Sequence, residues 1–342
     1  MTQAAGGLLA RNPVLWRILG IVAVLGLMVF AFAQSAAATT GDEASVAPGT
    51  NKFLQTILQG TIYGLLLALA SVGLSLIYGT TGLSNFAHGE AVTFGAAVAY
   101  VAITKMHAPL WGAIVVAVIM GSVAGWFLDL ALWKQLRRRG VPNMQQMIVS
   151  IGLALILVNL IQIWIGPDRL RLISATAVVH RLGPIQLSST DIASVVICVL
   201  ALGGVGFFLM RTRLGRATRA VSDNPALASA TGISVNRVIR IVWIMAGALA
   251  ALAGPLLALY NDTLDFMLGA NILLMMFAAV TLGGLGQPFG AVVGALVIGI
   301  VAQLTTVYAP TPDLKYAAVL LILILTLLVR PQGILGRKER VG

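Results

Sequence analysis

Charged side chains are scarce in this sequence of 342 residues: Asp, Glu, Lys and Arg make up 10% of it, against 59% hydrophobic residues. Soluble domains carry far more charge. The balance therefore excludes a soluble globular protein and predicts membrane-spanning helices, each with about 20 apolar residues. The net charge of +11 does not indicate nucleic-acid binding, because the basic residues lie in short loops between apolar runs, where they orient a membrane protein.

Cysteine and enzyme signatures are also missing. Cys198 is the only cysteine and lies in an apolar run, which excludes an intrachain disulfide and a thiol metal cluster. The sequence has no G-x-S-x-G, no H-E-x-x-H and no G-x-x-x-x-G-K-[ST] phosphate loop. We therefore expect no catalytic residue, metal or cofactor in this chain. If ATP powers the protein, another polypeptide hydrolyses it.

Long apolar runs recur along the chain and predict an all-α polytopic integral membrane protein with about ten transmembrane helices. After a first run near the N-terminus, the predicted helices are Phe53–Gly79, Phe86–Thr104, Leu110–Trp133, Met144–Ile165, Ile192–Met210, Val238–Tyr260, Ile272–Leu282, Phe289–Val307 and Leu314–Val329. The run Ile272–Leu282 is short and is followed by the helix-breaking stretch GGLGQPFG. Three small-xxx-small pairs or ladders predict close helix packing: Gly60/Gly64, Gly121/Gly125 and Gly286/Gly290/Gly294.

The first run, Ile18–Ala33, follows two arginines and precedes a stretch of small residues, AFAQSAAA. It fits a cleaved secretory signal and a retained transmembrane anchor equally well. The chain accordingly divides into residues 1–52, a signal-anchor or first transmembrane helix with an external loop, and residues 53–342, the main transmembrane domain. That domain includes a cytoplasmic loop at 211–237.

Lys and Arg are distributed unevenly between the two sides of this topology. With ten crossings and a cytoplasmic N-terminus, 16 of the 22 basic residues fall in inside loops and 6 in outside loops. This bias matches the positive-inside rule and predicts that both termini are cytoplasmic.

The longest polar interval on the basic side runs from Arg211 to Arg240 and holds six arginines against one acid, Asp223. It contains a short helix signal: Asn224 as N-cap, Pro225 at the first helical position and Gly232 as the stop. A helix of about 10 Å is too short to be stable alone, so it must pack against something. It is either a docking element for a cytoplasmic partner or an ordinary basic loop.

A second polar stretch, GLSNFAHGEAVTFG, places Asn85, His88 and Glu90 at the cytoplasmic mouth of an apolar helix. These residues form either a structural polar cluster or part of a gate. The i, i+2 spacing of His88 and Glu90 does not suit a metal site. Asn159 and Gln162 share a helix face and either line a path or bond a neighbouring helix, and Asp129 is expected to pair with Lys134 or Arg137.

Four stretches occur in the order and spacing of a known family: YGTTGLSNFAHGEAVTFGAAVAY, GRATRAVSDNPALASATGISVNRV, AAVTLGGLGQPFGAVVGALVIGI and VRPQGILGR. Over residues 53–337 the chain resembles the LivH-type permeases of ATP-binding cassette (ABC) importers. This family serves branched-chain amino acids and includes urea and short-chain amide permeases. The resemblance implies the ABC importer permease fold in a bacterial plasma (inner) membrane.

The resemblance also implies partners: a second, LivM-like permease, two cytoplasmic ATP-binding subunits that hold ATP and Mg²⁺, and an extracytoplasmic substrate-binding protein. It assigns ATPase coupling to Arg216, Arg219, Asp223, Asn224, Pro225, Ala228 and Gly232. The expected translocation path or gate comprises Asn85, His88, Glu90, Asn159, Gln162, Thr281 and Gln287. The alternatives are a urea or amide importer and a self-sufficient ion-coupled carrier, which would use carboxylates within the membrane.

Overall fold

The computed structural model describes residues 51–172, 178–182, 185–330 and 332–336. All nine apolar runs predicted from Phe53 onward are helical. The predicted first run, Ile18–Ala33, lies outside the described residues, so the structure does not bear on its cleavage or on the boundary at residue 52.

The main helices follow the predicted runs closely and are separated by short connections. They are α3 (Lys52–Thr81), α4 (His88–Met106), α5 (Leu110–Leu128), α7 (Asn143–Ile165), α8 (Ser189–Arg211), α11 (Val235–Tyr260), α12 (Leu268–Gly283), α13 (Pro288–Tyr308) and α14 (Leu314–Val329). A π-helical turn, η1 (Asp129–Trp133), and α6 (Lys134–Arg138) continue α5. Within the described ranges, six helical stretches are long and apolar enough to cross a membrane, and α12 and α14 are shorter apolar helices.

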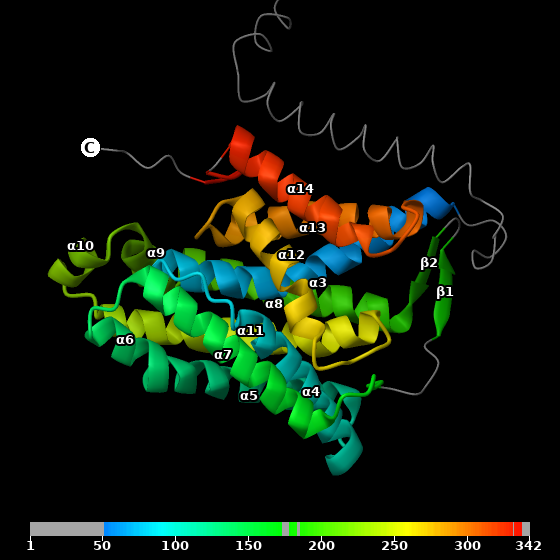
Figure 1. Cartoon of the computed structure of the whole chain (residues 1–342), viewed down its shortest axis with the longest axis horizontal. Coiled ribbons are helices and arrows are strands. Elements are labelled where there is room, and N and C mark those ends of the chain that lie inside the picture. Colours follow the sequence, from blue (N-terminus) through cyan, green and yellow to red (C-terminus); the bar gives the residue numbers. More distant parts are fainter. Residues whose placement is uncertain (1–50, 173–177, 183–184, 331, 337–342) are drawn as a thin grey trace, which may run out of the picture.

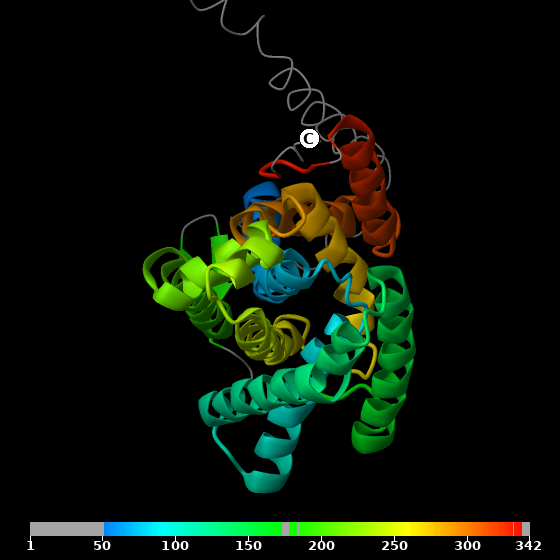
Figure 2. The same ribbon diagram turned by 90° about the vertical axis from the view of Figure 1, so that its left-hand side faces the viewer.

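Helix α3 is the centre of the bundle. Figure 2 looks along it and shows α3 in blue, with α12 and α13 on one side and α11 on the other. The predicted glycine contacts are confirmed: a Cβ atom on Gly60 would lie 2.7 Å from Cα of Ile300, and one on Gly64 would lie 2.8 Å from Cα of Leu296. The backbones of α3 and α13 are therefore in contact, as small residues allow.

The other two predicted glycine sets also mediate close packing. Gly121 and Gly125 of α5 face Gly247 and the Trp243 carbonyl of α11. The ladder Gly286/Gly290/Gly294 meets Gly79, the Gly283 carbonyl and the Ala279 carbonyl in turn.

The two ends of the bundle differ in structure and charge. One end carries α6, two short helices, α9 (Arg213–Asp223) and α10 (Pro225–Ala230), and the C-terminal residues 332–336 (Figure 1). The opposite end carries a hairpin of β1 (Val179–Leu182) and β2 (Ile185–Ser188), paired antiparallel with Val179 opposite Ser188. The hairpin lies between the predicted helices Met144–Ile165 and Ile192–Met210, where the sequence predicted no strands. We call these the α10 end and the hairpin end; most of the basic loops lie at the α10 end.

Candidate functional site

The segment between α3 and α4 folds back into the bundle. Asn85, His88 and Glu90 lie at the start of an apolar helix, as predicted, but the prediction that this start is at the cytoplasmic end is wrong. His88 Nε2 lies 3.0 Å from the carbonyl oxygen of Ala70, which is about 16 Å from the end of α3 at 1.5 Å per residue. Helix α4 therefore begins in the middle of the bundle, and all three polar side chains are buried.

This re-entrant backbone is stable because its polar groups find partners within the protein. Phe86 N donates to Ser150 Oγ on α7 at 3.0 Å, and Ala87 N donates to Asn85 Oδ1 at 3.2 Å. Gly82 turns the chain with φ 67°, a conformation that favours glycine. Irregular backbone at membrane depth is tolerated where protein covers it in this way.

His88 and Glu90, both in the first turn of α4, differ in their hydrogen bonding. Because a carbonyl oxygen only accepts, His88 Nε2 carries the proton that it donates to Ala70. Glu90 is 3% exposed, and its Oε2 has no hydrogen-bond partner in the part of the chain that the structure describes. A buried carboxyl oxygen without a partner is costly, so it requires an explanation.

A cavity of about 400 Å³ lies next to these residues, between α4, α5, α7 and α11. Among the described residues that line it, the only polar ones apart from two tryptophans are Asn85, His88 and Glu90. The remaining lining residues are aliphatic, aromatic or glycine: Ile77, Ala87, Ala91, Phe94, Gly121, Ala124, Gly125, Phe127, Leu128, Leu157, Leu160, Ile161, Trp164, Trp243 and Gly247. This is the arrangement of a small-molecule site, an apolar pocket with a few polar groups.

The other four predicted path residues do not line this cavity. Asn159 is exposed on α7 and its Nδ2 donates to the Leu155 carbonyl of its own helix at 2.6 Å; Gln162 lies one turn further along α7 and is half-buried. Thr281 is buried near the end of α12, at the α10 end. Gln287 precedes α13 and lines a smaller cavity beside α9. The structure thus brings together three of the seven residues.

The predicted short helix is confirmed as α10. Asn224 Oδ1 accepts from Leu227 N at 3.0 Å, and Pro225 is the first helical residue. Gly232 follows the helix with φ 87°, and Ile233 N bonds back to the Ala228 carbonyl at 3.1 Å. The preceding helix α9 was not predicted, although Thr212 caps it through a bond from Gly215 N at 2.9 Å.

Side chains of this segment divide into an inner and an outer face. Ala228 is 4% exposed and packs with Val221 and Val238, so it holds α10 against α9 and α11 and does not face outward. The other predicted coupling residues are exposed: Arg216, Arg219, Asp223, Asn224, Pro225 and Gly232. Leu227, an apolar side chain 63% exposed on α10, is not among the residues predicted from the sequence.

Helix α9 is in direct contact with the core of the bundle. A Cβ atom on Gly79, near the end of α3, would lie 3.0 Å from Ser222 Oγ of α9 and 3.0 Å from the Gly286 carbonyl. Thr218, Arg219 and Gln287 line the small cavity at this junction. A displacement of α9 and α10 would therefore act directly on the central helix.

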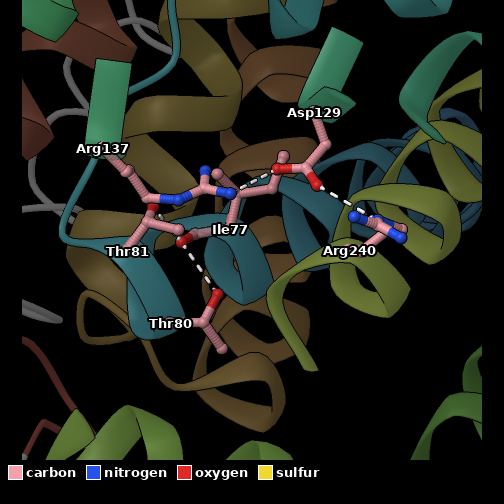
Figure 3. Close-up of polar contacts among 6 residues, drawn as sticks. All are labelled: Ile77, Thr80, Thr81, Asp129, Arg137 and Arg240. Atoms are coloured by element: carbon pink, nitrogen blue, oxygen red, sulfur yellow. Dashed lines mark hydrogen bonds and ion pairs between the residues drawn. The ribbon is translucent and has the colours of Figure 1, made fainter. Parts of the chain in front are cut away.

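A buried ionic cluster fixes the beginning of α11, the helix that follows α10 (Figure 3). Asp129 in η1 is 0% exposed; its Oδ1 lies 2.5 Å from Arg137 Nη2 and its Oδ2 lies 3.8 Å from Arg240 Nε on α11. The expected partner Arg137 is thus confirmed, and the second is Arg240 in place of Lys134. The Trp133 and Trp243 rings stack beside the cluster with centroids 5.4 Å apart.

Comparisons with known proteins agree with this architecture. Residues 56–328 match the family model described as "Branched-chain amino acid transport system / permease component". Over 300 residues, 84% of the chain, it is 30% identical to the high-affinity branched-chain amino acid transport system permease protein LivH of Salmonella typhimurium, covering 96% of that protein. It is 30% identical over 307 residues to BraD of Pseudomonas aeruginosa, covering 85% of the chain and 98% of BraD.

A third relative is archaeal, the probable branched-chain amino acid transport permease protein LivH of Methanocaldococcus jannaschii. It is 34% identical over 299 residues, covering 82% of the chain and 92% of that protein. No solved structure matches the chain. The family match covers most of the chain and the relatives are covered almost completely, so this multi-pass membrane protein belongs to the family of permease components of branched-chain amino acid transport systems.

Proposed function

We propose that this chain is one of two permease subunits of an ATP-driven importer in a bacterial plasma membrane, and that it carries branched-chain or related amino acids. The relatives named above are permeases for branched-chain amino acids. The observation that carries the proposal is the α9–α10 unit. It is exposed at the arginine-rich end of the bundle and packs on the end of the central helix α3.

In this proposal the α10 end faces the cytosol, because the cytoplasmic loops of membrane proteins carry an excess of Lys and Arg. Leu227 then presents an exposed apolar side chain that a groove of the partner can bury, and Arg216 and Arg219 are exposed on the neighbouring helix α9. The docking partners are two ATPase subunits that bind ATP and Mg²⁺. When they close on ATP, α10 moves with them and transmits the movement through α9 to α3.

A second, LivM-like permease completes the path, and an extracytoplasmic binding protein docks at the hairpin end to deliver the solute. Hydrogen bonds order the hairpin end. The Gln55 side chain of α3 donates to the Gln186 carbonyl of β2 at 2.9 Å, and the backbones of Leu170 and Leu264 form an antiparallel β-bridge. The cavity beside Asn85, His88 and Glu90 is the part of this chain that we assign to the path.

Reconstituted vesicles test the proposal. Vesicles that contain this chain, its partner permease and the ATPases are expected to accumulate labelled leucine only when both the binding protein and ATP are supplied, because this chain has no ATP-binding motif of its own. Vesicles that contain this chain alone are expected to accumulate none. Nucleotide-independent accumulation by this chain alone would instead identify an ion-coupled carrier, and uptake of urea in place of leucine would identify a urea importer.

A further inference from the structure

We infer that the cavity between α4, α5, α7 and α11 binds a small zwitterion with an apolar side chain, holding its ammonium group at Glu90 and its carboxylate at the start of α4. This inference rests on the proposed function and names the groups within this chain that hold the solute during passage.

Glu90 forms the part of the site that binds the ammonium group of the ligand. Its Oε2 is buried and has no hydrogen-bond partner among the residues that the structure describes, and Glu90 is one of the residues that line the cavity. An ionised carboxylate in such a place is costly unless a cation pairs with it. No lysine or arginine is among the described residues that line the cavity, so a cation that pairs with Glu90 there would come from a ligand. Ionisable groups inside a membrane protein commonly mark substrate pathways for this reason.

The start of α4 forms the part of the site that binds the carboxylate of the ligand. This helix of 19 residues begins in the middle of the bundle, and no side chain caps its first turn. The first amide groups of a helix and its dipole attract anions, and transporters use broken helices at membrane depth in this way. Ala87, His88 and Ala91 border the cavity around this helix start, and Asn85 adds an amide group. The unpartnered Glu90 oxygen is an independent sign that a ligand belongs here.

The rest of the cavity fits an aliphatic or aromatic side chain. Its volume of about 400 Å³ is within the usual range of ligand pockets, and the walls opposite α4 are apolar. Phe94 and Trp164, with ring centroids 6.1 Å apart, cover it toward the hairpin end. Phe127 of α5 and Leu160 of α7 also line it, although both side chains are partly exposed at the surface. Urea and simple amides carry no cation for Glu90 and no side chain for these walls.

The test is leucine binding to the purified complex of this chain with its partner permease and ATPases, without the binding protein. Glu90→Gln keeps the size of the side chain and removes its charge. It should weaken leucine binding about 10- to 100-fold, the range for one charge-assisted hydrogen bond. Glu90→Asp keeps the charge and should retain part of the affinity. The probe 4-methylpentanoate has the carboxylate and aliphatic chain of leucine without the ammonium, so Glu90→Gln should not weaken its binding.

Asp262→Asn is the matched control, because it makes the same chemical change in an exposed ion pair with Arg171 outside the cavity. It should bind leucine as the unmodified complex does. Equal leucine affinity in Glu90→Gln would overturn the inference, as would a phospholipid in the purified complex that occupies the cavity and is not displaced by leucine. If the unmodified complex performs ATP-driven leucine uptake while Glu90→Gln binds and transports normally, only the cavity assignment fails. If the unmodified complex shows no ATP-driven uptake, the proposed function fails.

Discussion

Leu227→Asp is expected to abolish ATP-driven uptake while the protein remains inserted and folded. Leu227 is 63% exposed on α10 and belongs to none of the apolar clusters formed by the described residues, so the bundle does not need it. Burying a leucine side chain in a partner's groove contributes about 2 kcal/mol to binding, and a carboxylate in its place also carries a desolvation penalty. The affinity of the ATPase for the permease should therefore fall at least about 30-fold. Co-purification and leucine uptake by vesicles measure the two effects.

Met106→Asp provides the matched control. Met106 is a similarly exposed apolar residue at the last position of α4, at the hairpin end. This variant should retain the ATPase, since the change is on the other side of the membrane from the proposed docking surface. Retention of the ATPase by Leu227→Asp would show that α10 is not the docking element. Ala228 is unsuited to this test because it is buried, and a large residue there would displace α10 from α9 and α11.

Gly299→Leu is expected to destroy the packing of the bundle. A Cβ atom on Gly299 of α13 would press into the backbone of Gly64 and lie 2.7 Å from the Gly60 carbonyl of α3. Backbone atoms cannot turn away as a side chain can, so α13 would have to separate from the central helix. Overpacking costs about 1–3 kcal/mol even where side chains can adjust, and more is expected here. The measurement is the thermal unfolding midpoint in detergent, together with the yield of monodisperse protein.

Gly203→Leu is the control for this variant. Gly203 lies on α8, and an added Cβ would meet nothing within 4 Å. Leucine also has a higher helix propensity than glycine, so the unfolding midpoint should stay the same or rise slightly. If both variants unfold at the same temperature as the unmodified protein, the close approach of α3 and α13 is not a requirement of the fold.

Features that depend on local pattern were predictable from the sequence. Apolar runs located the helices to within a few residues. A segment that crosses lipid must satisfy its own backbone hydrogen bonds, and an α-helix does so within a single run. Asn224, Pro225 and Gly232 fixed the limits of α10, because capping is a local interaction. The spacing of small residues predicted which helix faces approach closely, although not the partner of each face.

Features that depend on tertiary contacts were not predictable. The Gly82–Ala87 segment was assigned to the membrane boundary, since nothing in its sequence reveals that Ser150 and Ala70 bond it within the bundle. Arg240 is far from Asp129 in sequence, so its pairing with that residue followed only from the fold. Leu227 was not predicted as a site residue, because the exposure of a side chain cannot be judged from the sequence of so short a helix.

Coupling to a cytoplasmic ATPase requires α10 to lie on the cytoplasmic side of the membrane, and chemical labelling can measure directly on which side it lies. Cys198 is buried, so a cysteine placed at Leu227 or, as a control, at Met106 is selectively accessible to a membrane-impermeant maleimide. The cysteine at 106 should react in intact cells. The cysteine at 227 should react only in inverted membrane vesicles stripped of peripheral proteins. Labelling at 227 in intact cells would place α10 outside the cell, where no ATPase can move it, and would contradict the account.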